Sequence, residues 1–199
     1  QEWYDKHLQI HDAFLGPQRS QWRLETAELN YVIMALNDPW LWRYPTLCIN
    51  AQHYDIVNLI GGGNTLYVMD CDTGIMKKTL DQFDRDTQRN IRSMIRNLDR
   101  FDFEPKIDPW QPLDWGPPPE QFGYIICWNL FTCYTRDVMR HNISAVAGLL
   151  RPGGRFIFNV NDCDDAAGAK LAANHVVSWM TRSLLEPLVT EAGLELVEY

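Results

Sequence analysis

The sequence predicts an α/β fold in which helices cover both faces of a mostly parallel sheet. Short apolar runs alternate with longer amphipathic segments along the chain, and two runs, residues 124–130 and 155–160, are largely apolar. Parallel strands need long crossover connections, usually helices, and strands covered on both faces carry continuous apolar runs. A chain of 199 residues is long enough for one such doubly wound domain.

The amino-terminal part is predicted to be helical. Its last apolar residues recur at helical spacing: Leu29, Val32, Ile33 and Leu36. Asn37-Asp38-Pro39 ends this pattern, because proline disfavours a helical residue before it. Residues 1–43 are expected to form a helical extension or lid, and residues 44–199 the α/β domain. The tryptophans of the extension either line a pocket lid or pin helices to the sheet: Trp3, Trp22, Trp40 and Trp42.

Strands and helices alternate in the predicted α/β domain. Strands are expected at residues 46–50, 65–70, 101–107, 124–130, 155–160 and 194–199. Helices are expected at residues 73–99, in one or two pieces, 137–150 and 166–192. Gly61-Gly62-Gly63 indicates a turn into the second strand, and Arg151-Pro152-Gly153-Gly154 the end of a helix. The chain stops within its last expected strand, which suggests a piece of a longer protein.

Composition narrows the function classes. The net charge of −8 and the pI near 5.0 argue against a nucleic-acid partner. No apolar stretch approaches the roughly 20 residues that span a bilayer, so a cytoplasmic protein away from membranes is expected. Five cysteines without a CxxC pair are expected to be buried small hydrophobes, and no metal site is predicted. GxSxG and P-loop motifs are absent, which argues against hydrolases and phosphoryl transfer.

Ligands of doubly wound sheets bind beyond the carboxyl ends of the strands. Asp70 ends the second expected strand, where its carboxylate either accepts ribose hydroxyls or caps the next helix. Asp72 is better suited to the cap. After the third expected strand, Asp108-Pro109-Trp110 begins a stiff loop that either binds an adenine ring or only packs above the sheet.

Polar residues also follow the later strands. Asn129 stands at the end of the fourth expected strand and Tyr134 follows it, so an amide and a phenol face the expected reacting centre. His141, on the following helix, is the histidine that we expect as a base. The acidic run at residues 161–165 either binds a cation or forms a solvated loop.

Four segments together resemble the class I S-adenosylmethionine-dependent methyltransferases, in particular their type 11 branch, over residues 44–199. They are residues 66–76, 107–131, 149–160 and 191–199. The resemblance implies a Rossmann-like fold and S-adenosylmethionine as cofactor, and the catalytic candidates remain Asn129, Tyr134 and His141. It implies these cofactor-binding residues: Asn50, Ala51, Asp70, Cys71, Asp108, Pro109, Trp110 and Asn129.

The turn after the first strand departs from that family. Residues 50–54 read Asn-Ala-Gln-His-Tyr, where the family carries a glycine-rich turn that lets the backbone approach the cofactor closely. The family's last antiparallel strand is also missing from the sequence.

Two alternative functions are expected from these observations. The chain transfers a methyl group to a small molecule or a protein side chain, by proximity and exclusion of water. Alternatively, it is an inactive methyltransferase-like domain that serves as a structural or protein-interaction module of a larger assembly.

Overall fold

The computed structural model describes residues 38–50, 65–81, 83–103, 121–128, 130–174 and 178–197. The chain divides into two compact units, Gln1–Asp38 and Pro39–Tyr199. The predicted amino-terminal helices lie outside the described residues, and the predicted domain boundary at residue 43 stays a prediction.

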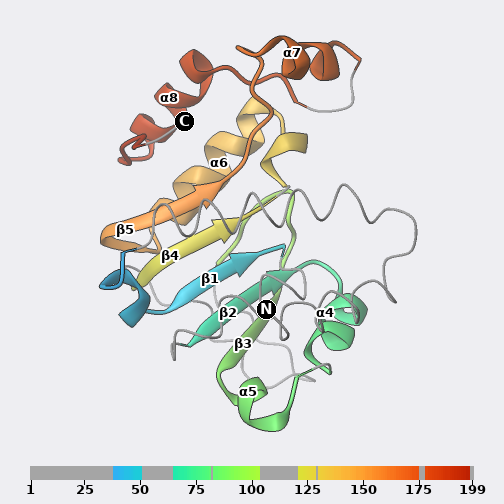
Figure 1. The fold of residues 1–199 in the computed structure, drawn as a ribbon, viewed down its shortest axis with the longest axis vertical. Coiled ribbons are helices and arrows are strands. Elements are labelled where there is room, and N and C mark those ends of the chain that lie inside the picture. The colour runs from blue at the N-terminus through green and yellow to red at the C-terminus, as the bar shows by residue number, and fades with distance from the viewer. Residues whose placement is uncertain are drawn as a thin grey trace, which may run out of the picture. The chain divides into compact units, whose positions relative to one another are not determined.

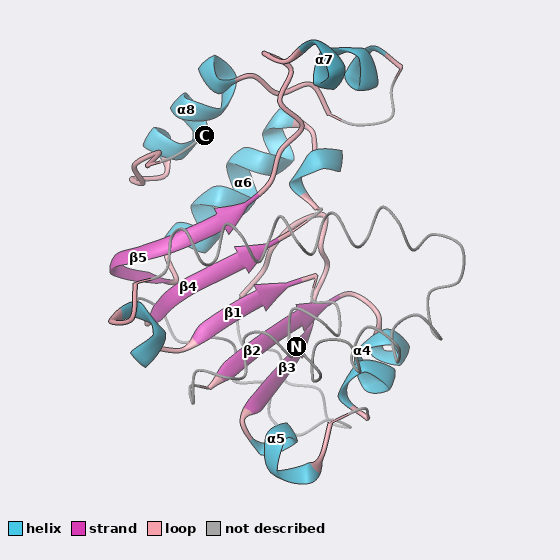
Figure 2. Cartoon of the chain, in the orientation of Figure 1, coloured by secondary structure: helices cyan, strands magenta, loops and turns pink. Residues whose placement is uncertain are grey.

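Five parallel strands form one sheet in the order β3-β2-β1-β4-β5 (Figures 1 and 2). They are β1 (Thr46–Ile49), β2 (Leu66–Asp70), β3 (Ile91–Ile95), β4 (Phe122–Cys127) and β5 (Leu150–Phe158). From β1 the sheet extends through β2 and β3 on one side, and through β4 and β5 on the other. This arrangement confirms the predicted doubly wound, parallel α/β fold.

Helices connect and cover these strands. They are α4 (Thr73–Leu80), α5 (Arg85–Arg89), α6 (Arg136–Ala147), α7 (Ala166–Ala173) and α8 (Arg182–Glu191), with short 3-10 helices η2 (Leu41–Arg43) and η3 (Phe131–Cys133). Asp84, Thr135 and Asp165 begin α5, α6 and α7 by accepting hydrogen bonds from first-turn amides. In the described part of the chain, no helix has both the length and the apolar character needed to cross a bilayer.

The third strand lies earlier in the chain than predicted. β3 falls within residues 73–99, which were expected to be helical, while residues 101–103 have no regular secondary structure. Ile91, Met94 and Leu98 are all buried at intervals of three and four residues, and this helical spacing is why the sequence predicted a helix here. Asn90 ends α5, and the parallel register of β3 with β2 then decides the conformation.

The start of β5 also differs from the prediction. Residues 151–154 do not end a helix, because α6 has already ended at Ala147 and these residues lie within β5. Phe122 pairs with Leu150 and Tyr124 pairs with Arg155, so residues 151–154 bulge out of the ladder.

The carboxyl-terminal region is more interrupted than predicted. Residues 166–192 form two helices instead of one continuous helical region. An isolated bridge joins Asp162, ahead of α7, to Met180, which lies between the two helices. Residues 194–197, predicted as a strand, have no regular secondary structure, and residues 198–199 lie outside the described residues.

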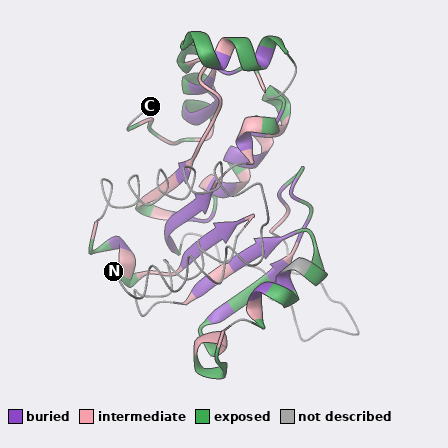
Figure 3. Cartoon of the chain, turned by 45° about the vertical axis from the view of Figure 1, so that its right-hand side comes forward, coloured by how far each residue is buried: buried purple, intermediate pink, exposed green. Residues whose placement is uncertain are grey.

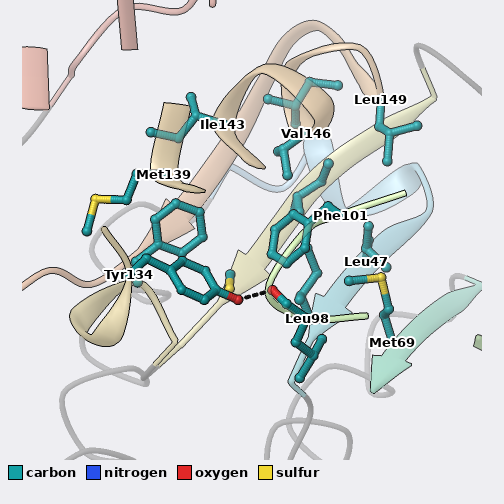
Figure 4. Packing of buried hydrophobic residues seen from close by; sticks show 14 of the residues in the cluster. Leu47, Met69, Leu98, Phe101, Tyr134, Met139, Ile143, Val146 and Leu149 are labelled. Atoms are coloured by element: carbon teal, nitrogen blue, oxygen red, sulfur yellow. Dashed lines mark hydrogen bonds between the residues drawn. The ribbon is translucent and has the colours of Figure 1, made fainter. Parts of the chain in front are cut away.

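The main core lies between the sheet and helices α6 and α8. Figure 3 shows the central strands buried, and Figure 4 shows part of the packing. Its members from β1, β2, β4, α6 and α8 include Leu47, Met69, Ile125, Met139, Ile143, Val146, Leu185 and Leu188. Every residue of β1 and β4 is buried, which confirms the prediction that the apolar run of the fourth strand is covered on both faces.

The segment that precedes β1 packs at the amino edge of the sheet. The ring of Trp42 lies 4.4 Å from that of Tyr124, centroid to centroid, and Tyr124 pairs with Thr46 at the start of β1. Because ligands of such sheets bind at the opposite edge, this contact favours the second of the two roles considered for Trp42, packing of its segment against the sheet; the lid stays a prediction. Trp3 and Trp22 lie outside the described residues.

Gly123 of β4 makes this packing possible, since a Cβ atom at this position would overlap the carbonyl oxygen of Leu41. We expect Gly123→Ala to destabilise the protein by about 1–3 kcal/mol through overpacking, measured as a lower urea midpoint. Gly148→Ala is the matched control, because its nearest neighbour would be the carbonyl oxygen of Ala145 at 3.7 Å. Equal midpoints for the two variants would contradict this account.

Candidate functional site

The carboxyl ends of β1 and β4 lie side by side where the strand order reverses. Ile49 of β1 pairs with Cys127 of β4, and the arrowheads in Figure 1 mark this edge. In open α/β sheets the crevice outside such a point is the usual ligand site. The residues that follow these strands, Asn50 and Trp128, are therefore the centre of the candidate site.

Asn50 ends β1 in the left-handed backbone conformation, with φ of 59°. Its N–H donates to the carbonyl of Met69 at 2.8 Å, and its Nδ2 donates to the carbonyl of Trp128 at 3.4 Å. Side chains other than glycine rarely adopt a positive φ, and asparagine tolerates it better than most. Asn50 therefore adopts a glycine-like backbone conformation, although residues 50–54 contain no glycine.

Asp70 ends β2 and is buried, with 6% of its surface exposed. Its Oδ1 accepts a hydrogen bond from the amide of Asp72 at 3.0 Å. Asp72 in turn accepts from the amide of Gly74 at 2.6 Å, which caps α4 as predicted. The cap and the strand-end acid are thus separate residues, and the carboxylate of Asp70 stands at the carboxyl edge.

Cys71 follows Asp70 and is exposed. Partial burial of its sulfur, and then the negative charge of Asp70, raise the pKa of this thiol. The thiol therefore stays protonated at neutral pH, where it is a weak hydrogen-bond donor and a poor nucleophile.

Several predicted site residues lie outside the described residues, so their roles stay predictions: Ala51, Asp108, Pro109, Trp110 and Asn129.

Tyr134 lies in the core, where its phenol donates a hydrogen bond to the carbonyl of Leu98 (Figure 4). Its ring makes edge contacts with Phe101 and Phe131. Burial raises the pKa of Tyr134 well above its ordinary value, and the nearby Cys127 adds to the shift. The phenol is protonated at neutral pH and already engaged, so these contacts favour a structural role; the catalytic role stays a prediction.

His141 lies on α6, with its Nε2 3.1 Å from the carbonyl oxygen of Phe101. Asn142 beside it is fully buried, and its Oδ1 accepts from the amide of Phe101 at 2.9 Å. The role of His141 as a base stays a prediction, and its described partner is backbone. Sequence reasoning did not single out Asn142; a polar residue on the apolar face of the expected helix was the available signal.

The acidic run at residues 161–165 is occupied by backbone hydrogen bonds. Asp165 caps α7 through the amide of Ala167 at 2.8 Å, and Asp164 accepts from the amide of Arg182 at the start of α8, also at 2.8 Å. These bonds support a loop that organises two helix starts.

The chain was compared with known protein families, sequences and solved structures. No protein-family model and no curated protein sequence matches the chain, whereas 241 chains of solved structures do. One is geranyl diphosphate C-methyltransferase from Streptomyces coelicolor A3(2), with a TM-score of 0.60 and 11% identity over 92% of this chain and 67% of that one. Another is the mitomycin 7-O-methyltransferase MmcR, with a TM-score of 0.63 and 10% identity over 88% of this chain and 49% of that one.

A third similar structure is the PH0226 protein from Pyrococcus horikoshii OT3, with a TM-score of 0.60 and 13% identity over 89% of this chain and 84% of that one. The chain spans about half the length of some matched structures, such as 53% of the glycopeptide N-methyltransferase MtfA. At these identities the likeness shows the fold: the chain has the Rossmann-like fold of the class I S-adenosylmethionine-dependent methyltransferases, as its segments predicted.

The left-handed turn at Asn50 gives a stability prediction. Asn50→Gly should change the unfolding free energy by less than about 1 kcal/mol, whereas Asn50→Ala should cost about 1–2 kcal/mol, because alanine tolerates a positive φ poorly. Chemical denaturation measures both. At Asn90, where φ is −90°, alanine should be tolerated better than glycine. If glycine and alanine variants had the same order of stability at Asn50 and at Asn90, a left-handed conformation of Asn50 would be contradicted.

The raised pKa of Tyr134 gives a pH prediction. The folded state holds the phenolic proton more tightly than the unfolded state, so this stabilisation is fully present below the unfolded tyrosine pKa of about 10 and is lost as pH rises above it. Wild type should therefore lose stability more steeply than Tyr134→Phe above pH 10, in denaturation series at increasing pH. Parallel pH curves for the two proteins would exclude this contribution.

Proposed function

We propose that the chain binds S-adenosylmethionine at the carboxyl edge of its sheet and transfers the methyl group to a small molecule or a protein side chain. The left-handed turn at Asn50 carries the proposal, because it stands where the strand order reverses and lies next to the strand that ends in Asp70. The fold supports the choice of cofactor, since similar structures are methyltransferases and one is described in complex with S-adenosyl-L-homocysteine.

The groups at this edge fit the cofactor chemically. The carboxylate of Asp70 has the two oxygens needed to accept from ribose hydroxyls. The indole Nε1 of Trp128 is buried and, among the described residues, has no hydrogen-bond partner. A buried donor without a partner costs stability, so a ligand acceptor would satisfy it.

In this proposal the cofactor and the residues of the chain have different roles. The bound cofactor supplies an electrophilic methyl group on a sulfonium. Asp70 and the turn at Asn50 would hold it, with Ala51, Cys71 and residues 108–110 proposed as further contacts. Asn129 is proposed to orient the methyl acceptor. Proximity and exclusion of water account for the rate, so the proposal needs no proton transfer by Tyr134 or His141.

A second candidate function is an inactive methyltransferase-like module within a larger assembly. The hydrogen bond from Asn50 Nδ2 to the carbonyl of Trp128 favours it, because a side chain here bridges the two strands that flank the ligand crevice. A glycine would leave that space open to the cofactor.

Calorimetry with S-adenosylhomocysteine and S-adenosylmethionine on the full chain separates the two functions. We expect wild type to bind, and Asp70→Asn to weaken binding by about tenfold or more, because a hydrogen bond to a charged acceptor is worth about 1.5–3 kcal/mol. Asp86→Asn is the matched control, since Asp86 is an exposed carboxylate on α5, ahead of β3. If neither ligand binds at millimolar concentration, the methyltransferase function is rejected and the inactive module is the function that remains.

A further inference from the structure

The segment that follows β3 has no regular secondary structure, and it alternates exposed residues with buried ones. Leu98 is 8% exposed and Phe101 is 2% exposed. Buried backbone N–H and C=O groups need partners, and this segment has no helix or strand bonds of its own to supply them. Its position therefore depends on side chains that bind its backbone, in addition to the core packing of Leu98 and Phe101.

Two consecutive residues of α6 bind the backbone of Phe101 from both sides. Asn142 Oδ1 accepts from the Phe101 amide at 2.9 Å, and His141 Nε2 lies 3.1 Å from the Phe101 carbonyl. Because a carbonyl oxygen can only accept, Nε2 is the donor and carries the hydrogen. Tyr134 donates to the carbonyl of Leu98 in the same segment (Figure 4).

The other end of the segment is tied to the end of β2. Arg96 is 3% exposed, and its Nε donates to the carbonyl of Asp102 at 3.0 Å. The amide of Arg96 donates to the carbonyl of Asp70 at 2.9 Å. Hydrogen bonds and the covalent chain thus connect α6 through Phe101, Asp102 and Arg96 to the backbone carbonyl of Asp70, the residue whose carboxylate lies at the candidate site.

We propose that His141 and Asn142 are positioning residues, which hold the carboxylate of Asp70 in place for cofactor binding through Phe101 and Arg96. The inference rests on the proposed function and gives His141 a role through backbone atoms, without proton transfer. α6 is the first α-helix after β4, so the proposal connects the helix that follows β4 with the acid that ends β2. A shift of Phe101 displaces the Asp102 carbonyl, and Arg96 is the residue that passes this displacement to Asp70.

Affinity for S-adenosylhomocysteine tests the proposal in the full chain. His141→Leu removes the donor and should weaken binding about fivefold, the effect of one neutral hydrogen bond. His141→Gln keeps a donor at the place of Nε2 and should restore most of the affinity. Gln88→Leu is the control, because it also removes a side-chain donor to backbone carbonyls. Gln88 Nε2 donates to the carbonyls of Leu80 and Phe83 at 3.0 and 2.9 Å, ahead of β3. Unchanged binding by His141→Leu would overturn the proposal.

A double-mutant cycle separates positioning from general destabilisation. If His141 acts through Asp70, then His141→Leu should have little further effect on affinity in an Asp70→Asn background. A full fivefold effect in that background would overturn the proposal.

Amide hydrogen exchange without ligand keeps the proposal distinct from the proposed function. The amides of Phe101 and Asp72 should exchange several-fold faster in His141→Leu than in Gln88→Leu, since Asp72 donates to Asp70 Oδ1. Unchanged exchange at Asp72 would overturn the connection. Faster exchange in a protein that fails to bind S-adenosylhomocysteine would retain the connection and reject the cofactor site.

Discussion

Parallel pairing of β1 with β2 on one edge and with β4 on the other is the constraint from which the candidate site follows. Three strands that run in one direction bring their carboxyl ends to the same edge, and the chain leaves β1 where the strand order reverses. Asn50, Asp70 and Trp128 are neighbours for this reason alone, although many residues separate them in sequence. Both of the strands that meet at this point, β1 and β4, are buried along their whole length.

Around that edge, side chains replace secondary structure as partners of buried backbone. Asn142, His141 and Tyr134 bind the segment after β3, and Asp164 and Asp165 bind the starts of two helices. Each of these residue types is common in active sites, yet here each satisfies backbone groups that the fold would otherwise leave unpaired. Polar residues close to a candidate site therefore include many that hold its shape.

The two candidate functions differ in what happens at one side chain. Asn50 adopts the backbone conformation that a glycine-rich turn would have, and it still carries an amide that reaches the carbonyl of Trp128. If the amide rotates away, the turn resembles a binding turn; if it stays, it occupies the crevice. The fold is compatible with both, because similar folds can keep or lose their chemistry.

The sequence by itself determined β1, β2 and β4, whose apolar runs have no competing helical interpretation, and the cap at Asp72, which depends on a neighbour two residues away. Tertiary structure decided β3, because its buried residues Ile91 and Met94 are spaced as in a helix, and parallel pairing with β2 makes the segment a strand. It also decided the left-handed turn at Asn50 and the partner of His141, which lies 40 residues away along the chain. Features that depend on neighbours in sequence, such as a helix cap, can be predicted from the sequence. Contacts between distant segments cannot, because they depend on which strands pair in the sheet.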